Sequence, residues 1–184
     1  MKSYQERFLK NYKKEVQPAG NKKGYRKVYT YVGDHYTWEP KFMSMTNLRR
    51  LFIILEAVTV VLFILATFLG ASVNYSLPAM IGALVSGVVW LFEGYGLISF
   101  CFRKLPLEED EFRYVHSVFR ITFLVRAVCL LFTVVAGIVY LAEKNFEVTG
   151  VLAVTGYFII ALIALYLFAL YQKTAKSSKV IPNT

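Results

Sequence analysis

Four long apolar stretches constrain this chain more than any other feature. They run from about 51 to 70, 77 to 101, 118 to 142 and 150 to 171. Each has about 20 residues or more, which at 1.5 Å per residue is enough to cross a hydrocarbon core of roughly 30 Å. The stretches do not alternate in the way that a membrane β-barrel requires. The sequence therefore predicts an all-α integral membrane protein, built as a bundle of four transmembrane helices.

Composition excludes two other classes of protein. Hydrophobic residues make up 57% of the chain and charged residues 18%, whereas a disordered chain has low hydrophobicity and high charge. The two cysteines, Cys101 and Cys129, both lie in apolar runs. We therefore expect buried, reduced thiols and no disulfide scaffold.

The distribution of positive charge predicts the orientation. There are 21 Lys and Arg against 12 Asp and Glu, a net charge of +9. Eighteen of the 21 lie before the first stretch, between the second and third, or after the fourth, and the two other connections hold only Lys144. By the positive-inside rule, this places both termini in the cytoplasm of a multi-pass protein of the cell membrane. The charge is then a topology signal, and the lipid bilayer, not nucleic acid, is the expected partner.

The prediction divides the chain into three parts. Residues 1–47 form a basic cytoplasmic segment, residues 48–171 the four-helix domain, and residues 172–184 a cytoplasmic tail. Apolar residues recur at helical spacing near the start of the first segment: Tyr4, Phe8, Leu9, Tyr12 and Val16. We expect an amphipathic helix there, lying either on the inner membrane surface or on the protein's own cytoplasmic face.

Two further local structures are expected on the cytoplasmic side. Residues 25–38 are rich in β-branched and aromatic side chains around Gly33-Asp34, which predicts a β-hairpin. Between the second and third stretches, Pro106 precedes four acidic residues at 108–111. This pattern indicates a helix start, so the third helix begins before the membrane. The acids either cap this helix in solvent, which we favour, or pair with the basic segment.

Ionisable groups inside the spans are the candidate functional residues, since a charge at the centre of a spanning helix costs about 2.5–3.5 kcal/mol. Arg120 lies near a membrane end and reaches the headgroups by snorkelling. Glu56 lies roughly 10 Å deep, and Glu93 and Arg126 roughly 15 Å deep, at 1.5 Å per residue. Three helices thus bring two carboxylates and one guanidinium to a similar level.

Small and polar residues accompany these charges on each helix, as at interhelical contacts. The secondary candidates in these stripes are Thr59, Ser86, Trp90, Thr133 and Tyr157. One interpretation is an ion-pair cluster that fixes helix register, with Arg126 neutralising one carboxylate and the other protonated or hydrogen-bonded. The other is a polar site for a proton, a cation or a cationic substrate, since one carboxylate lacks a counter-charge.

Enzyme signatures are missing from the sequence. His35 and His116 have no Cys or His at metal-ligand spacing, and there is no Cys-x-x-Cys or nucleotide-binding loop. We expect no metal, no cofactor and no catalytic residue. The first hypothesis is a non-enzymatic subunit or accessory component of a membrane assembly such as a transport system, with a protein partner or a homo-oligomer. The alternatives are a small autonomous oligomeric transporter or channel that uses Glu56, Glu93 and Arg126, and a membrane-embedded lipid-modifying enzyme.

Overall fold

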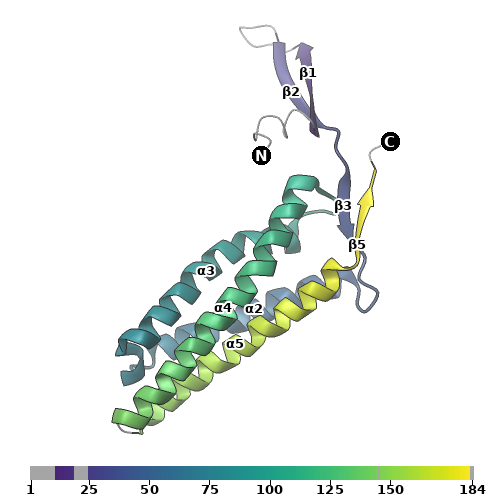
Figure 1. Ribbon diagram of the computed structural model, residues 1–184. Coiled ribbons are helices and arrows are strands. Elements are labelled where there is room, and N and C mark those ends of the chain that lie inside the picture. The colour runs from purple at the N-terminus through teal and green to yellow at the C-terminus, as the bar shows by residue number, and fades with distance from the viewer. Residues whose placement is uncertain (1–10, 19–24, 145, 183–184) are drawn as a thin grey trace.

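Four long helices form the body of the protein, in a computed structural model that describes residues 11–18, 25–144 and 146–182 (Figure 1). They are α2 (Met45–Phe68), α3 (Leu77–Phe102), α4 (Glu109–Lys144) and α5 (Val148–Ala175). A short 3-10 helix, η1 (Ser72–Tyr75), connects α2 to α3. All four helices are long and apolar enough to cross a membrane. The predicted set of four apolar helices is confirmed.

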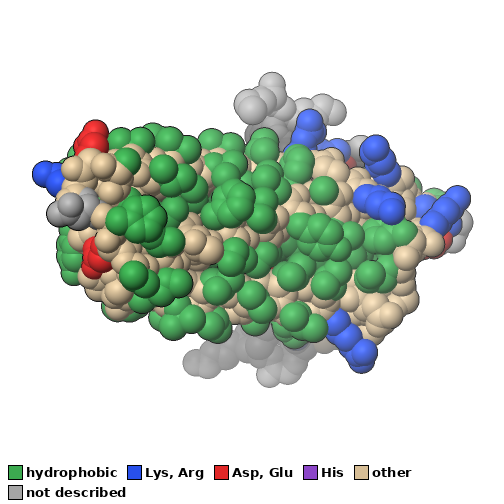
Figure 2. All heavy atoms as spheres, turned by 90° about the horizontal axis from the view of Figure 1, so that it is seen from below, with side chains coloured by type: hydrophobic (Ala, Val, Ile, Leu, Met, Phe, Trp, Pro, Cys, Tyr) green, Lys and Arg blue, Asp and Glu red, His purple; other side chains and the backbone are tan. Residues whose placement is uncertain are grey.

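The surface of the bundle matches a lipid environment. Large hydrophobic side chains are exposed along every helix, such as Leu65, Leu91, Val128 and Leu162. Figure 2 shows them covering one face of the bundle, with Lys and Arg gathered near one end. A soluble protein rarely exposes so much contiguous apolar surface.

The helices pack in the order α3, α4, α5, α2, and among these neighbours α2 and α3, which close the ring, make the least contact. Small residues allow the close approaches. A Cβ atom at Gly82 would overlap the side-chain oxygen of Thr133 and lie 3.0 Å from the backbone oxygen of Cys129, so a larger residue does not fit where α3 meets α4 unless a neighbour moves. Along α5, small residues such as Gly150, Ala153 and Ala161 are buried.

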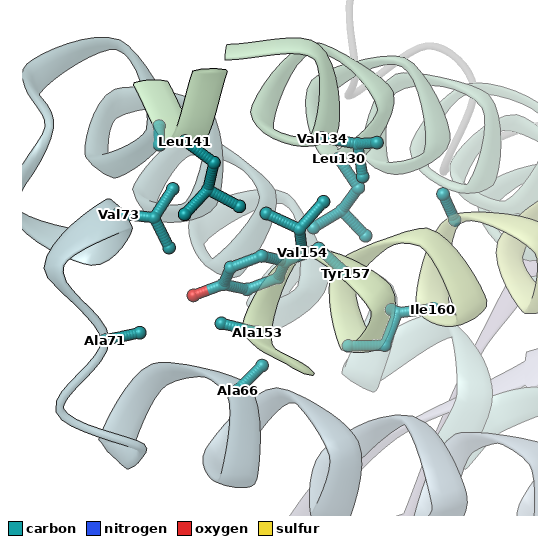
Figure 3. Close-up of a cluster of buried hydrophobic side chains, with 12 residues drawn as sticks. Ala66, Ala71, Val73, Leu130, Val134, Leu141, Ala153, Val154, Tyr157 and Ile160 are labelled. Atoms are coloured by element: carbon teal, nitrogen blue, oxygen red, sulfur yellow. The ribbon is translucent and has the colours of Figure 1, made fainter. Parts of the chain in front are cut away.

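Two apolar clusters fill the interior. One lies at the end of the bundle that holds η1, the loop end, and includes Leu130, Val154 and Tyr157 (Figure 3). The other lies at the opposite end, the sheet end, and is mostly aromatic, with Phe52 and Phe100 among its members. Glu56 on α2 lies in sequence between Phe52 of one cluster and Ala66 of the other. Glu56, one of the candidate functional residues, therefore lies between the two apolar clusters.

A three-stranded sheet closes the sheet end. The central strand β3 (His35–Trp38) pairs antiparallel with β4 (Leu107–Glu108) and with β5 (Ser178–Ile181). Trp38 is 2% exposed. Its ring lies edge-on to Phe100, at 5.3 Å between centroids, and stacks on Phe112 at 4.8 Å. This packing anchors the sheet to α3 and α4.

A two-stranded hairpin projects beyond the helices (Figure 1). Strand β1 (Tyr12–Pro18) pairs antiparallel with β2 (Tyr25–Tyr31), from Tyr12 opposite Tyr31 to Pro18 opposite Tyr25. The hairpin contacts the end of β4 and the start of α4. The Tyr12 hydroxyl donates to the Glu108 carboxylate, and the Tyr31 hydroxyl accepts from the Glu109 backbone N–H at 3.0 Å. The hydrogen bond to Glu108 raises the pKa of Tyr12 above its ordinary value.

Two predictions for the first segment are corrected. The amphipathic helix is wrong from Tyr12 onward, because residues 12–18 form β1, and residues 1–10 lie outside the described residues. The hairpin around Gly33-Asp34 is also wrong, although strands occur on both sides of it. β2 pairs with β1, and β3 pairs elsewhere. An isolated hairpin is marginal in water, whereas β3 gains the burial of Trp38 by turning toward the bundle.

The four acidic residues at 108–111 make more contacts within the protein than a helix cap in solvent, the interpretation that we favoured, would make. α4 begins at Glu109, before the apolar stretch, as predicted. Glu109 pairs with Arg113 and accepts from the Asn11 amide at 3.2 Å, and Glu111 pairs with Arg103. The acids thus connect α4 to the N-terminal hairpin and to the end of α3.

Candidate functional site

The three buried charges meet inside the bundle. Glu56 on α2 is 4% exposed, and Glu93 on α3 and Arg126 on α4 are each 1% exposed. Their similar depth on three helices predicted that they lie at one level, and the structure brings all three side chains into contact. We call them the buried charge cluster.

Glu56 is the main partner of Arg126. Arg126 Nη2 donates to Glu56 Oε1 at 2.8 Å, and Nη1 donates to Oε2 at 3.0 Å. Two parallel bonds of this kind are the strongest geometry for an arginine–carboxylate pair. Trp90 Nε1 adds a third bond to Glu56 Oε2 at 2.8 Å. Glu56 therefore has the donors that an ionised carboxylate requires.

Glu93 is held differently. Its Oε1 lies 3.0 Å from Arg126 Nη1, the nitrogen that also donates to Glu56. Neither Glu93 oxygen accepts a hydrogen bond from the described residues, and Arg126 Nε and Thr59 Oγ1 are likewise buried without a hydrogen-bond partner there. Orphaned polar atoms of this kind are costly in a dry interior. Their concentration at one level marks this site as chemically unusual.

Aromatic rings complete the wall of the cluster. The Arg126 guanidinium carbon lies 5.5 Å from the centroid of Phe123 and 6.0 Å from that of Trp90. Both distances are within reach of cation–π attraction. Phe63 lies beyond Trp90, with 6.1 Å between ring centroids. The cluster is thus enclosed by apolar and aromatic groups, which strengthens every electrostatic interaction inside it.

The secondary candidates divide into two groups. Trp90 belongs to the cluster through its bond to Glu56, and Thr59 lies one turn along α2 from Glu56. Ser86 is buried two turns from Glu93 on α3. Thr133 is buried but donates to Cys129 O of its own helix at 3.0 Å. Tyr157 lies in the loop-end core, beside Ala153 and Val154 (Figure 3).

Tyr157 is part of a polar junction that the sequence analysis missed. Its hydroxyl donates to Asn74 Oδ1 at 3.0 Å, and the Asn74 amide donates to Ala66 O at 2.8 Å and to Thr67 O at 3.1 Å. The amide thus satisfies carbonyls that the end of α2 leaves free. Gly70, with a φ of 66°, takes the left-handed conformation that commonly ends helices. In the sequence, this glycine was the one feature that could have indicated the end of the helix.

A second loop-end contact involves Glu147, which precedes α5. It accepts hydrogen bonds from the Ser72 hydroxyl and the Thr149 hydroxyl, both at 2.5 Å, and from the Ser72 backbone N–H at 3.2 Å. These bonds, those from Ser72 first, hold the pKa of Glu147 below its ordinary value. Glu147 therefore connects η1 to the start of α5. The sequence did not predict this contact, because an acidic residue in a short loop is not a specific pattern.

A groove of about 300 Å³ follows the contact between α2 and α3. It is lined mostly by apolar residues, among them Phe63, Ala83 and Leu91, with Asn74 and Tyr157 at its polar end. Phe63 lines this groove and contacts Trp90, whose indole N–H donates to Glu56. The groove thus faces the apolar flank of the bundle, and its residues do not include the cluster.

Histidine does not form a metal site in the described residues. His116 Nδ1 lies 3.2 Å from the Tyr171 hydroxyl, and its ring stacks on Phe112. Within residues 11–18, 25–144 and 146–182, no group of three or more His, Cys, Asp or Glu side chains could hold a metal ion.

In comparisons with protein-family models, curated proteins and solved structures, nothing matches this chain.

Proposed function

We propose that this chain is a non-enzymatic, multi-pass protein of the cytoplasmic membrane, and that it works as a subunit or accessory component of a membrane assembly such as a transport system. The observation that carries this proposal is the β1–β2 hairpin. It extends beyond the bundle, and of its described side chains most are exposed. Within residues 11–18, 25–144 and 146–182, β1 and β2 pair only with each other, so in this part of the chain no further strand lies along either outer edge. A free strand edge is a template for pairing with another chain.

The charge of the hairpin suggests what it binds. Lys13, Lys14, Arg26 and Lys27 are exposed on the two strands, with Glu15 as the one acid there. A basic surface favours a partner with an acidic face, and long-range attraction would speed association. The basic side chains are distinct from those that attach the hairpin to the rest of the chain: Tyr12 and Tyr31 make the hydrogen bonds to Glu108 and Glu109, whereas the four Lys and Arg are exposed.

Purification from native membranes in mild detergent tests this proposal. We expect the full chain to retain a stoichiometric protein partner. A chain that begins at residue 33 loses the hairpin but keeps β3 and all four helices, so it should still fold cooperatively, with a melting temperature near that of the full chain, and lose the partner. Retention of the same partner by the shortened chain would contradict the proposal, as would a full chain that purifies only as a homo-oligomer.

A second candidate is a small autonomous transporter or channel that uses the buried charge cluster. The observation that favours it is Glu93, whose oxygens accept no hydrogen bond from the described residues. Intramembrane carboxylates of this kind often mark ion or proton pathways. Reconstitution in vesicles would separate the candidates: proton or cation flux that disappears in Glu93→Gln supports the transporter.

The proposed orientation makes a prediction of its own. We expect a cysteine at position 146 to react with a membrane-impermeant reagent in intact cells, and a cysteine at 178 to react only after the membrane is opened. Both native side chains, Phe146 and Ser178, are exposed, so the reagent has access. Cys101 and Cys129 are replaced by Ala to remove background. External labelling at position 178 would overturn the orientation.

A further inference from the structure

The buried charge cluster holds one more negative charge than positive charge if both carboxyl groups are ionised. In the part of the chain that the structure describes, Arg126 is the one cation that contacts Glu56 and Glu93. The fourth helix does not help, because α5 has no charged side chain between Gly150 and Tyr171. An isolated charge in a dry interior is strongly unfavourable, so the group binds a proton or finds a counter-ion.

The contacts distinguish the two carboxyl groups. Glu56 receives three hydrogen bonds, two from Arg126 and one from Trp90, and all three donors favour the ionised form. Glu93 receives none from the described residues, although its Oε1 lies near Arg126 Nη1. The negative charge therefore belongs on Glu56.

Glu93 also has neighbours that can accept a hydrogen bond. Besides Arg126, the polar groups that interact with Glu93 include the Glu56 carboxyl group and the Thr122 hydroxyl. Thr122 already donates its own proton to Val118 O at 2.8 Å, which leaves the lone pairs of its oxygen free to accept. A neutral Glu93 would thus have a place for its O–H group.

We infer that Glu93 is a proton-binding site, so that Glu56, Glu93 and Arg126 form a neutral buried unit with one shared proton. The proton comes from water and adds to a carboxylate oxygen of Glu93, and no other bond is made or broken. Two carboxyl groups that share one proton are a known response to like charges at short range. This inference holds whether the chain is a subunit or a transporter, since it depends only on the contacts within the bundle.

Infrared spectroscopy tests the inference directly. In an alkyl maltoside, which has no carbonyl group, the wild-type chain at neutral pH should show the C=O stretch of a neutral carboxyl group. The band should shift when the protein is prepared in D₂O. It should be lost in Glu93→Gln and kept in the control Glu143→Gln, since Glu143 is exposed.

The two glutamates should also differ in their effect on melting temperature. Gln has nearly the shape of a protonated Glu, so Glu93→Gln should melt near the wild-type temperature. Glu56→Gln places an amide group against the donors of Arg126 and Trp90, so it should melt at a lower temperature. In that variant Glu93 becomes the counter-charge of Arg126, and the neutral-carboxyl band should vanish.

Several results would overturn the inference. One is a wild-type spectrum without the band, and another is a band that persists in Glu93→Gln. If a metal cation balanced the charge instead, the band would be absent and the melting temperature would depend on whether sodium or potassium is present. Glu93→Asp covers the case in which Glu93→Gln does not fold: it keeps a carboxyl group and should move the band, and an unmoved band would assign the proton elsewhere.

Discussion

Arg126→Leu should lower the free energy of unfolding in detergent by about 3–5 kcal/mol, the usual cost of removing one partner from a buried ion pair. The substitution removes both bonds from the guanidinium to Glu56 and the nearby charge that faces Glu93. It leaves two carboxyl groups in the aromatic and apolar layer between the two core clusters. Circular dichroism during denaturation measures the change.

Arg120 supplies the matched control for this prediction. It lies on the same helix, less than two turns before Arg126, but it is exposed. Arg120→Leu removes the same charge and should change the free energy of unfolding by less than about 0.5 kcal/mol. If both variants lost the same free energy of unfolding, the effect would come from the lower net positive charge of the chain and not from the buried charge cluster.

Trp38→Ala should have a comparable effect at the sheet end, a loss of about 3–5 kcal/mol. Trp38 is 2% exposed and packs against Phe100 and Phe112. Its removal leaves a cavity beneath the central strand, so the strand that joins β4 to β5 is held less firmly on the bundle. Denaturation measures the loss, and faster proteolysis near Lys41 should accompany it.

Two further substitutions sharpen the test of Trp38. Trp38 Nε1 is buried without a hydrogen-bond partner in the described residues, so Trp38→Phe should cost much less than Trp38→Ala. Val180→Ala on β5 is the control, because Val180 is 54% exposed. A stable Trp38→Ala variant would show that the sheet contributes little to the fold.

The sequence was sufficient to predict the helices and the level of the buried charges. Length and apolar character determine a membrane-spanning helix within its own residues. Depth also follows from counting residues, which is why Glu56, Glu93 and Arg126 were expected at one level. Depth does not determine which oxygen faces which nitrogen. The strong pairing of Arg126 with Glu56 and the weaker contact with Glu93 depend on helix rotation, which the sequence pattern leaves open.

The sheet could not be predicted because its strands are short and distant in sequence. β4 has two residues and β5 four, too few for periodicity to be read. Their pairing joins residues near positions 36, 107 and 180. Local patterns at Gly33-Asp34 favoured a hairpin instead, and the burial of Trp38 against α3 and α4 overrides that preference. The contacts of Asn74 and Glu147 could not be predicted either, because they depend on how two loops meet.

A double-mutant cycle on Arg126 and Glu56 tests the buried charge cluster most directly. The free energies of unfolding of Arg126→Leu, Glu56→Leu and the double variant are measured in one detergent. We predict that the double variant is more stable than Arg126→Leu alone, with an interaction energy of about 0.5–3 kcal/mol, because removing both partners leaves no stranded charge on Glu56. Strictly additive losses would contradict the account and show that the two residues do not form a pair in the folded protein.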